Sequence, residues 1–391
     1  MAIFLDSTLR EGALYRLFPK EINTELARLA LEYGADVLEL PLPYRTSKEE
    51  TCELIRNVRE AKTNCLVILH GRASRSDIED MKEFDVDGGA AYLSPTSSHR
   101  KWKLHDMSRE EAEQRLMEAA DMLKSQNRKY NRVTIEDAST LYFEDREFLF
   151  RLLNELKQRD VIISVPDTRG RLFPEQIESF AQDLVGTGAK LGGHNHDDFG
   201  FANYNTAIEA ANGFYEVHTT LMGIGERNGI ADPFPTALIM ESIGVRSKIR
   251  IDGAERIYSE FCAFTDIDQN FKHVFSKESR SLSAGVHQTY PEGYFPEQKL
   301  KHSDIILRAT PHLSSKIVDR ILRHAGHSLE TETVKALTSS IAKKSAELNG
   351  DLTSEQIAEV VKNETGIHLD PNHISRLKIR RTGLSTEPHS S

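Results

Sequence analysis

The sequence predicts an α/β protein, a (β/α)8 TIM barrel followed by a mostly helical C-terminal extension. Over roughly the first 225 residues, short apolar runs alternate with longer segments of helical periodicity. The apolar runs number eight, which is the strand count of such a barrel. We expect the strands at Ala2–Leu5, Val37–Leu40, Cys65–Leu69, Ala90–Leu93, Arg132–Ile135, Val161–Val165, Lys190–His194 and Glu216–Thr220.

The segments between these runs have apolar residues at helical spacing. Lys20–Tyr33 carries Leu26, Leu29 and Ala30 three or four residues apart, and Ser108–Lys124 and Asp145–Gln158 show the same pattern. A doubly wound sheet is the alternative fold. It usually has fewer strands and a glycine-rich first turn, and neither a GxGxxG nor a GxxxxGK[ST] motif follows the first run.

The pattern changes after about residue 245, which predicts further domains. We expect the barrel at 1–245, a linker or lid at 246–300, a small helical subdomain at 301–381 and a disordered tail at 382–391. Ser276–Tyr294 is rich in Ser, Gly and His and is typical of a loop or lid. Amphipathic helices are expected at Ile251–Phe264, Lys316–Ala325, Thr331–Leu348 and Thr353–Glu364.

Composition excludes several classes of function for this chain of 391 residues. The formal net charge is −10, which argues against a nucleic-acid partner. No apolar run is long enough to span a membrane, and the N-terminus has no signal-peptide pattern. The 3 cysteines are widely spaced, as expected of free thiols in a reducing compartment. We therefore expect a cytoplasmic protein that acts on small molecules.

Polar side chains follow every predicted strand. In a TIM barrel these positions form the catalytic face. The polar residues that we single out there are Arg10, Glu11, Glu39, His70, Arg72, Arg100, Arg132, Glu136, Thr168, His194 and His196. Polar residues at the ends of all eight strands indicate an active site rather than a chance distribution.

The pattern His194-Asn195-His196 is the sharpest local signal. Residues i and i+2 of an extended segment point the same way, so both imidazoles can bind one ion. A carboxylate such as Glu11 after the first strand would complete a three-ligand site for Zn, Mn, Fe or Co. The alternative is a pair of polar histidines that are hydrogen-bonded to Asp197 and Asp198.

The cationic residues are interpreted in two ways. Arg10, next to Glu11, is placed to hold an anion or a developing oxyanion, or it forms an ordinary ion pair at the barrel rim. The same alternatives apply to His70 and Arg72. Arg132 is expected to point into the barrel, where a substrate carboxylate would supply its anionic partner. Glu136 at the same end could support acid/base work.

Three motifs resemble those of the DRE-TIM metallolyase superfamily. They are Asp-Ser-Thr-Leu-Arg-Glu-Gly at 6–12, His-Asn-His-Asp-Asp-Phe-Gly at 194–200 and Gly-Ile-Gly-Glu-Arg-Asn-Gly-Ile at 223–230. The chain is most similar to the Claisen-condensing branch, which comprises homocitrate, 2-isopropylmalate and citramalate synthases. The forms Ser-Thr-Leu-Arg-Glu-Gly and Glu-Arg-Asn-Gly-Ile favour homocitrate synthase within that branch.

The resemblance implies a reaction and a set of roles. The family condenses acetyl-CoA with a 2-oxo acid and hydrolyses the thioester, with a divalent metal (Zn, Mg, Mn or Co) polarising the ketone. Carried over by motif, Glu11, His194 and His196 hold the metal, and Arg10 steadies the oxygen that becomes alkoxide. The expected pocket residues are Glu39, His70, Arg72, Arg100, Arg132, Glu136 and Thr168. His287 and Tyr294 match in kind residues that serve acetyl-CoA enolisation from a partner subunit, which implies a domain-swapped homodimer.

The sequence also departs from the family. The usual Gly-Glu-Gln after the first motif is Gly12-Ala13-Leu14 here. Two alternatives therefore stay open: a metal-dependent C–C lyase such as hydroxymethylglutaryl-CoA lyase, and a catalytically idle relative that binds or regulates. Among 2-oxo acids the cationic residues favour one with a second carboxylate, 2-oxoglutarate above all. A synthase for a different 2-oxo acid, giving 2-isopropylmalate, citramalate or citrate, is the alternative.

Overall fold

The computed structural model describes residues 1–44, 47–61, 64–288, 293, 295–302 and 305–375. It divides the chain into two compact units, Met1–Asp268 and Gln269–Ser391. Among the described residues, no helix is both long enough and apolar enough to cross a membrane.

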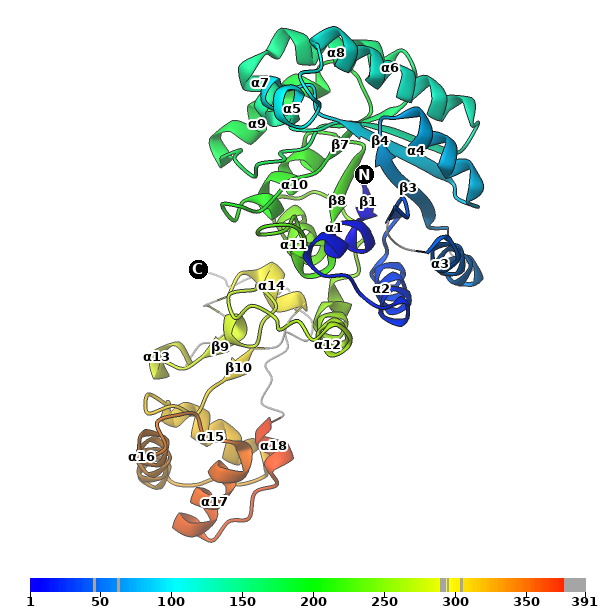
Figure 1. Cartoon of the computed structure of the whole chain (residues 1–391). Coiled ribbons are helices and arrows are strands. Elements are labelled where there is room, and N and C mark those ends of the chain that lie inside the picture. Colours follow the sequence, from blue (N-terminus) through cyan, green and yellow to red (C-terminus); the bar gives the residue numbers. More distant parts are fainter. Residues whose placement is uncertain (45–46, 62–63, 289–292, 294, 303–304, 376–391) are drawn as a thin grey trace. The chain divides into compact units, whose positions relative to one another are not determined.

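The first unit is a closed barrel of eight parallel strands, which confirms the predicted fold class (Figure 1). Each strand pairs with the next one along the chain, and β8 pairs back with β1. The strands are β1 (Ile3–Asp6), β2 (Val37–Pro41), β3 (Leu66–Arg72), β4 (Gly88–Leu93), β5 (Tyr130–Ile135), β6 (Ile162–Ser164), β7 (Leu191–Gly193) and β8 (Glu216–Thr219). All of the expected strands are present, with boundaries that differ by a few residues.

Helices surround the strands (Figure 1). They are α1 (Thr8–Tyr15), α2 (Lys20–Tyr33), α3 (Lys48–Glu60), α4 (Arg75–Asp80), α5 (Ser97–Trp102), α6 (Arg109–Ser125), α7 (Ala138–Glu144), α8 (Arg146–Lys157), α9 (Pro174–Val185), α10 (Ala202–Ala211), α11 (Pro233–Ser242) and α12 (Ala254–Thr265). The expected helix Lys20–Tyr33 is confirmed with its bounds. It buries its apolar face and ends at Gly34, whose φ of 102° suits a residue without a Cβ.

The barrel interior has an apolar floor and a polar layer above it. The floor is a buried cluster of Leu5, Val37, Ile68, Ala90, Tyr130 and Ile162. Side chains two residues apart on a strand point to the same face, so the residues that follow each floor residue by two also face inward. Among these, Glu39, His70 and Arg132 are buried polar side chains. Strand periodicity thus places the polar layer at the carboxyl ends of the strands.

The boundary of the first unit lies further along the chain than the sequence predicts. The barrel domain was expected to end at 245, but α12 packs against α2 and belongs to the same unit. Arg28 on α2 forms an ion pair of 2.5 Å with Glu260 on α12, and Arg16 donates to the backbone oxygen of Thr265 over 3.0 Å. An amphipathic helix must bury its apolar face, and the outer surface of the barrel provides the partner.

The second unit contains short elements and then a helical core. The short elements are β9 (Ser281–Leu282), α13 (Gly285–Gln288), α14 (Glu297–His302) and β10 (Ile306–Leu307), and β9 pairs with β10 in parallel. The expected loop at 276–294 therefore contains a strand and a helical turn.

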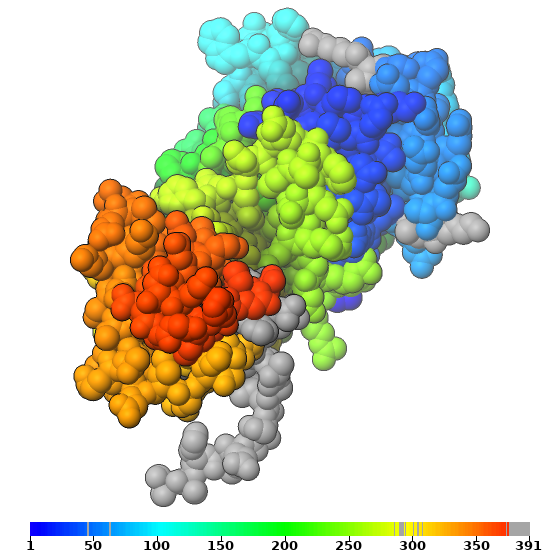
Figure 2. Space-filling view, turned by 90° about the horizontal axis from the view of Figure 1, so that it is seen from below, coloured from blue at the N-terminus to red at the C-terminus, as the bar shows by residue number. Residues whose placement is uncertain are grey.

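The helical core consists of α15 (Ser315–His324), α16 (Thr331–Glu347), α17 (Ser354–Thr365) and α18 (Pro371–Ser375). Figure 2 shows this part of the chain in orange to red. Its helices pack around one apolar cluster that includes Ile321, Leu337 and Val361. The expected tail at 382–391 lies outside the described residues.

Candidate active site

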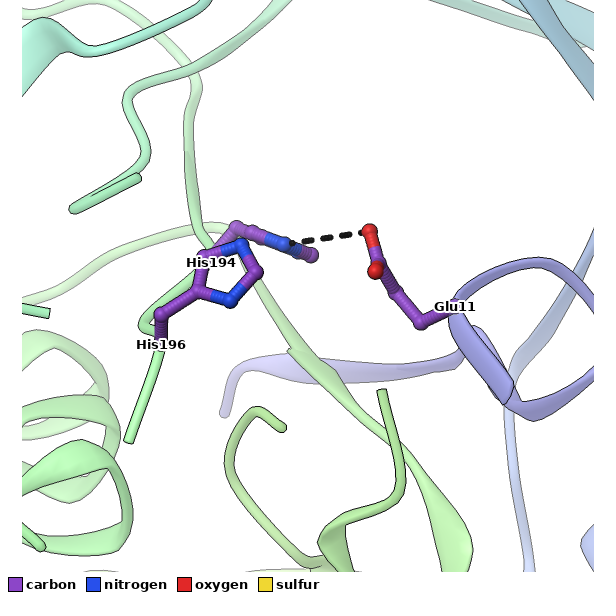
Figure 3. Close-up of side chains that lie close together, drawn as sticks. All are labelled: Glu11, His194 and His196. Carbon is purple, nitrogen blue, oxygen red and sulfur yellow. Dashed lines mark ion pairs between the residues drawn. The ribbon is translucent and has the colours of Figure 1, made fainter. Parts of the chain in front are cut away.

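Glu11, His194 and His196 come together at the carboxyl ends of the barrel strands (Figure 3). Their possible ligand atoms all lie within 4.8 Å of one another, and the three side chains are buried. Glu11 lies in the first turn of α1, directly after β1, and both histidines follow β7. The Nε2 atom of His194 is 3.5 Å from Oε1 of Glu11. Segments far apart in the sequence thus form one three-ligand cluster, as the motifs predict.

The chemistry of this donor set fits a divalent cation. Burial lowers the pKa of His194 well below its ordinary value, and the neighbouring His196 and His218 lower it further. Burial also lowers the pKa of His196. Neutral imidazoles keep the lone pair that binds a metal. Within the described residues, Nδ1 of His196 is buried without a hydrogen-bond partner, which is a further sign of a position for a ligand.

The local sequence explains why both histidines face the cluster. Asn195 lies between them and points the other way, donating to Oε2 of Glu209 over 2.6 Å and to Oγ1 of Thr206 over 3.1 Å. A Cβ at Gly193 would lie only 2.0 Å from that carboxylate oxygen. The absence of a Cβ at Gly193 therefore leaves room for the buried carboxyl group of Glu209, which accepts the hydrogen bond from Asn195.

The alternative interpretation of the two histidines is not supported. The side chain of Asp198 pairs with Arg227 over 2.8 Å, and Oδ1 of Asp197 accepts from the backbone N–H of Ala202 over 2.8 Å. Both aspartates are therefore bound to groups other than the imidazoles.

Arg10 joins the ligand cluster to the polar layer of the barrel. Its Nη1 group contacts Oε1 of Glu11 at 2.5 Å, and its Nε group contacts Oε2 of Glu39 at 2.5 Å. Glu39 also accepts from Nδ1 of His70 at 2.7 Å and from the hydroxyl of Ser7 at 2.6 Å. Burial alone would raise the pKa of Glu39, but the charges of Arg10 and Arg132 outweigh it and hold the pKa well below its ordinary value. Glu39 is therefore an anion that fixes the guanidinium of Arg10 beside Glu11, one of the three candidate ligands.

Arg132 points into the barrel as expected, but the protein itself supplies its anionic partners. The side chain is fully buried and is paired with Glu39 and, at 3.4 Å, with Glu216. Its Nη1 group is also 3.2 Å from the hydroxyl of Tyr130. The burial of Arg132 is therefore explained by these two carboxylates and does not require a substrate carboxylate. Its Nε group has no hydrogen-bond partner among the described residues.

Two site residues were missed by the sequence analysis. Glu216 and His218 lie on β8, both fully buried, and His218 is within 3.2 Å of His194. The available signal was the alternation of polar residues at 216 and 218 within a strand that was already predicted. That alternation predicts two side chains on the same face, but not which face.

Arg72 and Arg100 are bound to other parts of the barrel. The side chain of Arg72 is 60% exposed and forms an ion pair of 3.0 Å with Asp77. Arg100 donates to the backbone oxygens of Pro95 and Met107 at 3.1 and 3.0 Å, so it supports the loop after β4. Neither guanidinium contacts the ligand cluster in the described residues, and the expectation that both bind substrate stays a prediction.

Glu136 and Thr168 lie after β5 and β6, where the sequence places them. Glu136 forms an ion pair of 2.6 Å with Lys103. The hydroxyl of Thr168 accepts from the backbone N–H of Asp137 over 2.8 Å. Both groups have a partner within the barrel, and their contact with a substrate stays a prediction.

His287 and Tyr294 belong to the second unit. His287 is an exposed residue of α13, and Tyr294 lies outside the described residues. The roles expected for both stay predictions.

Comparison with known proteins identifies the family. The family model described as HMGL-like matches residues 1–258. The chain belongs to the HMGL-like family. This confirms the resemblance to the DRE-TIM metallolyases, and the matched segment lies within the barrel unit.

Curated relatives of this HMGL-like protein include synthases. It is 31% identical over 234 residues to a homocitrate synthase of Sulfolobus acidocaldarius, a match that covers 58% of this chain and 49% of the relative. It is 26% identical over 377 residues to a homocitrate synthase of Methanopyrus kandleri, with 92% of both chains covered. A probable 2-isopropylmalate synthase of the same organism is 25% identical, with 91% of this chain and 68% of the relative covered. The match thus spans about half the length of the Sulfolobus enzyme.

Solved structures support the fold. An HMG-CoA lyase from Brucella melitensis superposes with a TM-score of 0.56 at 16% identity, covering 68% of this chain and 97% of the lyase. At this identity the likeness shows the barrel fold and nothing about substrate.

Proposed function

We propose that this HMGL-like protein is a metal-dependent acyltransferase that condenses acetyl-CoA with a 2-oxo acid and hydrolyses the thioester. The observation that carries the proposal is the buried cluster of Glu11, His194 and His196, with Arg10 held against it. The relatives named homocitrate and 2-isopropylmalate synthase support a condensation over a lyase reaction.

Different residues of the chain have different roles in the proposed reaction. A divalent cation held by Glu11, His194 and His196 would polarise the ketone of the 2-oxo acid. Arg10 is fixed by two carboxylates, so its guanidinium is preorganised to donate to the ketone oxygen as negative charge develops there. An imidazole nitrogen of His287 takes the proton from the methyl group of acetyl-CoA, because histidine is the side chain that most often serves as a general base.

The proposal includes a homodimer in which the partner subunit provides His287 and Tyr294. Mixing a His287→Ala variant with a variant that lacks a metal ligand tests this arrangement. Heterodimers then contain one intact composite site, and activity returns if the catalytic groups act across the interface.

The substrate proposed first is 2-oxoglutarate. Its support is that relatives named homocitrate synthase cover most of this chain. The charges of the barrel favour a second candidate, a 2-oxo acid without a second carboxylate. In the polar layer the guanidinium groups of Arg10 and Arg132 already face the carboxylates of Glu11, Glu39 and Glu216. A second substrate carboxylate has to compete with those anions for the same cations.

Steady-state kinetics with 2-oxoglutarate, oxaloacetate, pyruvate and 2-oxoisovalerate decides between the two. The assay follows free thiol release from acetyl-CoA in the presence of a divalent metal. We expect 2-oxoglutarate to have the highest kcat/KM, because relatives named homocitrate synthase cover most of this chain. A higher kcat/KM for 2-oxoisovalerate than for either diacid would refute the dicarboxylate assignment. No thiol release with any acid would refute the synthase.

A further inference from the structure

His218 lies fully buried on β8, between a carboxylate and a proposed metal ligand. Its Nε2 atom is 2.9 Å from Oε1 of Glu216. Its Nδ1 atom is 3.2 Å from Nδ1 of His194, and the Nε2 atom of His194 is the one nearest Glu11. Glu216, His218 and His194 therefore form a continuous chain of polar contacts that ends at the ligand cluster.

The contacts of His218 determine where its proton lies. A carboxylate is an acceptor only, so the nitrogen 2.9 Å from Glu216 must carry a hydrogen. A cationic imidazole is disfavoured because the ring is fully buried and the guanidinium of Arg132 is 3.1 Å away, and these two effects outweigh the nearby carboxylate of Glu216. A neutral imidazole with its hydrogen on Nε2 has a lone pair on Nδ1, and this lone pair faces Nδ1 of His194.

Arg132 makes a competing contact, since its Nη1 group lies 3.1 Å from the same Nε2 atom. Because an arginine can only donate, a hydrogen bond from Arg132 would require a lone pair, and not a hydrogen, on Nε2 of His218. Nη1 of Arg132 has other acceptors, the hydroxyl of Tyr130 at 3.2 Å and Glu216 at 3.4 Å. A lone pair on Nε2 would instead face the carboxylate of Glu216 at 2.9 Å, which is repulsive. The contact with Glu216 therefore decides the position of the hydrogen.

We propose that His218 is a positioning residue that fixes the tautomer and the ring orientation of His194. Nδ1–H of His194 donates to Nδ1 of His218, which leaves the lone pair of His194 on Nε2, on the side of Glu11. Such partners of a ligating histidine hold the ring in place and raise its basicity. This role rests on the proposed metal centre at Glu11, His194 and His196.

The tautomer can be measured in the metal-free wild-type protein. Nitrogen-15 NMR of histidine-labelled protein distinguishes a protonated Nδ1 from a protonated Nε2. The His194 signals are assigned by their loss in a His194→Gln variant. We expect Nδ1–H on His194 and Nε2–H on His218. Nε2–H on His194 would overturn the proposal.

Metal affinity tests the consequence for binding. The dissociation constants for Zn²⁺ and Co²⁺ are measured by competition with a chromophoric chelator, without any turnover assay. His218→Leu removes the acceptor, and we expect affinity to fall by about 10–100-fold. His218→Asn places an amide oxygen near the original Nδ1, so it should recover part of that loss. Thr265→Val, which removes a different buried polar group of the same unit, is the matched control and should leave affinity unchanged.

The outcomes separate this role from the metal centre itself. If the wild-type protein binds neither cation, the metal centre is refuted and the role of His218 with it. If the wild type binds and His218→Leu binds equally well while circular dichroism shows it folded, only the role of His218 is refuted. Loss of affinity in His218→Leu with no recovery in His218→Asn would indicate packing rather than the hydrogen bond, and would also overturn the proposal.

Discussion

His196 is the single residue on which the proposed metal centre can be tested most directly. Its ring is buried in the ligand cluster, and its Nδ1 atom has no partner within the described parts of the chain. We expect His196→Ala to abolish stoichiometric binding of a divalent cation and, with it, turnover, because two ligands hold such an ion poorly. Measurement is by metal analysis after dialysis and by thiol release.

The control for this substitution is His324→Ala, which removes an exposed imidazole of α15 in the other unit. It should bind metal as the wild type does. Far-ultraviolet circular dichroism should show both variants folded, since the barrel core does not include either ring. Full activity of His196→Ala in a metal-free preparation would contradict the proposed centre.

Glu209 is a residue whose effect on stability has a defined pH dependence. Burial raises the pKa of its carboxyl group from 4.5 to about 8, although the hydrogen bond from Asn195 lowers it. Between these two values the native protein holds a proton that the unfolded chain has lost. The free energy of unfolding therefore falls as pH rises from about 4.5 to about 8, by at most about 1.4 kcal/mol per pH unit for this group.

Glu209→Gln should remove this contribution, because the amide keeps the shape and the acceptor for Asn195 but does not ionise. Urea unfolding at several pH values between 5 and 8 measures the slope. We expect the variant to be flatter than the wild type and more stable at pH 8. Glu364→Gln, an exposed position, controls for the loss of one acidic residue. Equal slopes in wild type and Glu209→Gln would show that this carboxyl group is not the source.

Among the elements, β7 shows how a short strand is adapted to the site that follows it. The strand carries two consecutive glycines, and a Cβ on Gly192 would lie 2.8 Å from Oε1 of Glu216. A Cβ on Gly193 would lie 2.0 Å from Oε2 of Glu209. A carboxyl group thus lies against each face of the strand, so close that a Cβ on either glycine would overlap with it.

Gly193→Ala should therefore destabilise the barrel by about 1–3 kcal/mol, the usual effect of overpacking. Chemical denaturation gives the difference directly. Combining it with Glu209→Ala should recover part of the loss, because the atom that clashes is gone. Gly253→Ala is the matched control, since its Cβ would meet Ile257 only at an ordinary 3.5 Å. If the Gly193→Ala variant is as stable as the control, helix α10, which carries Glu209, can shift to admit the Cβ without a loss of stability.

Strand periodicity carried most of what the sequence could predict. Apolar runs located all eight strands, and the i, i+2 rule placed His194 and His196 on one side. The partners of Arg132 could not be predicted, because Glu39 and Glu216 are 93 and 84 residues away in sequence and meet it only when the barrel closes. His218 lies on the strand that pairs with β7, but its alternation with Glu216 in the sequence does not show which face of β8 it occupies.

The whole molecule divides its proposed chemistry between two units. Glu11, His194 and His196 all belong to Met1–Asp268, and so does the arginine–carboxylate network that surrounds them. His287 belongs to the second unit. The sequence placed the boundary too early because the helix Ala254–Thr265 follows the last strand, and only its packing against α2 shows that it completes the barrel.

A chain that ends at Asp268 should therefore retain the metal centre and lose the condensation. We expect its affinity for a divalent cation to equal that of the full chain, because every ligand and its supporting contacts lie in the first unit. Thiol release should fall by about 10²–10⁴-fold, the range that a positioned general base contributes. His287→Ala in the full chain should show a loss of the same order, with metal affinity unchanged. If the shortened chain binds metal but His287→Ala turns over normally, the second unit contributes through another residue. If the shortened chain turns over as fast as the full chain, the proposed division between the units is wrong.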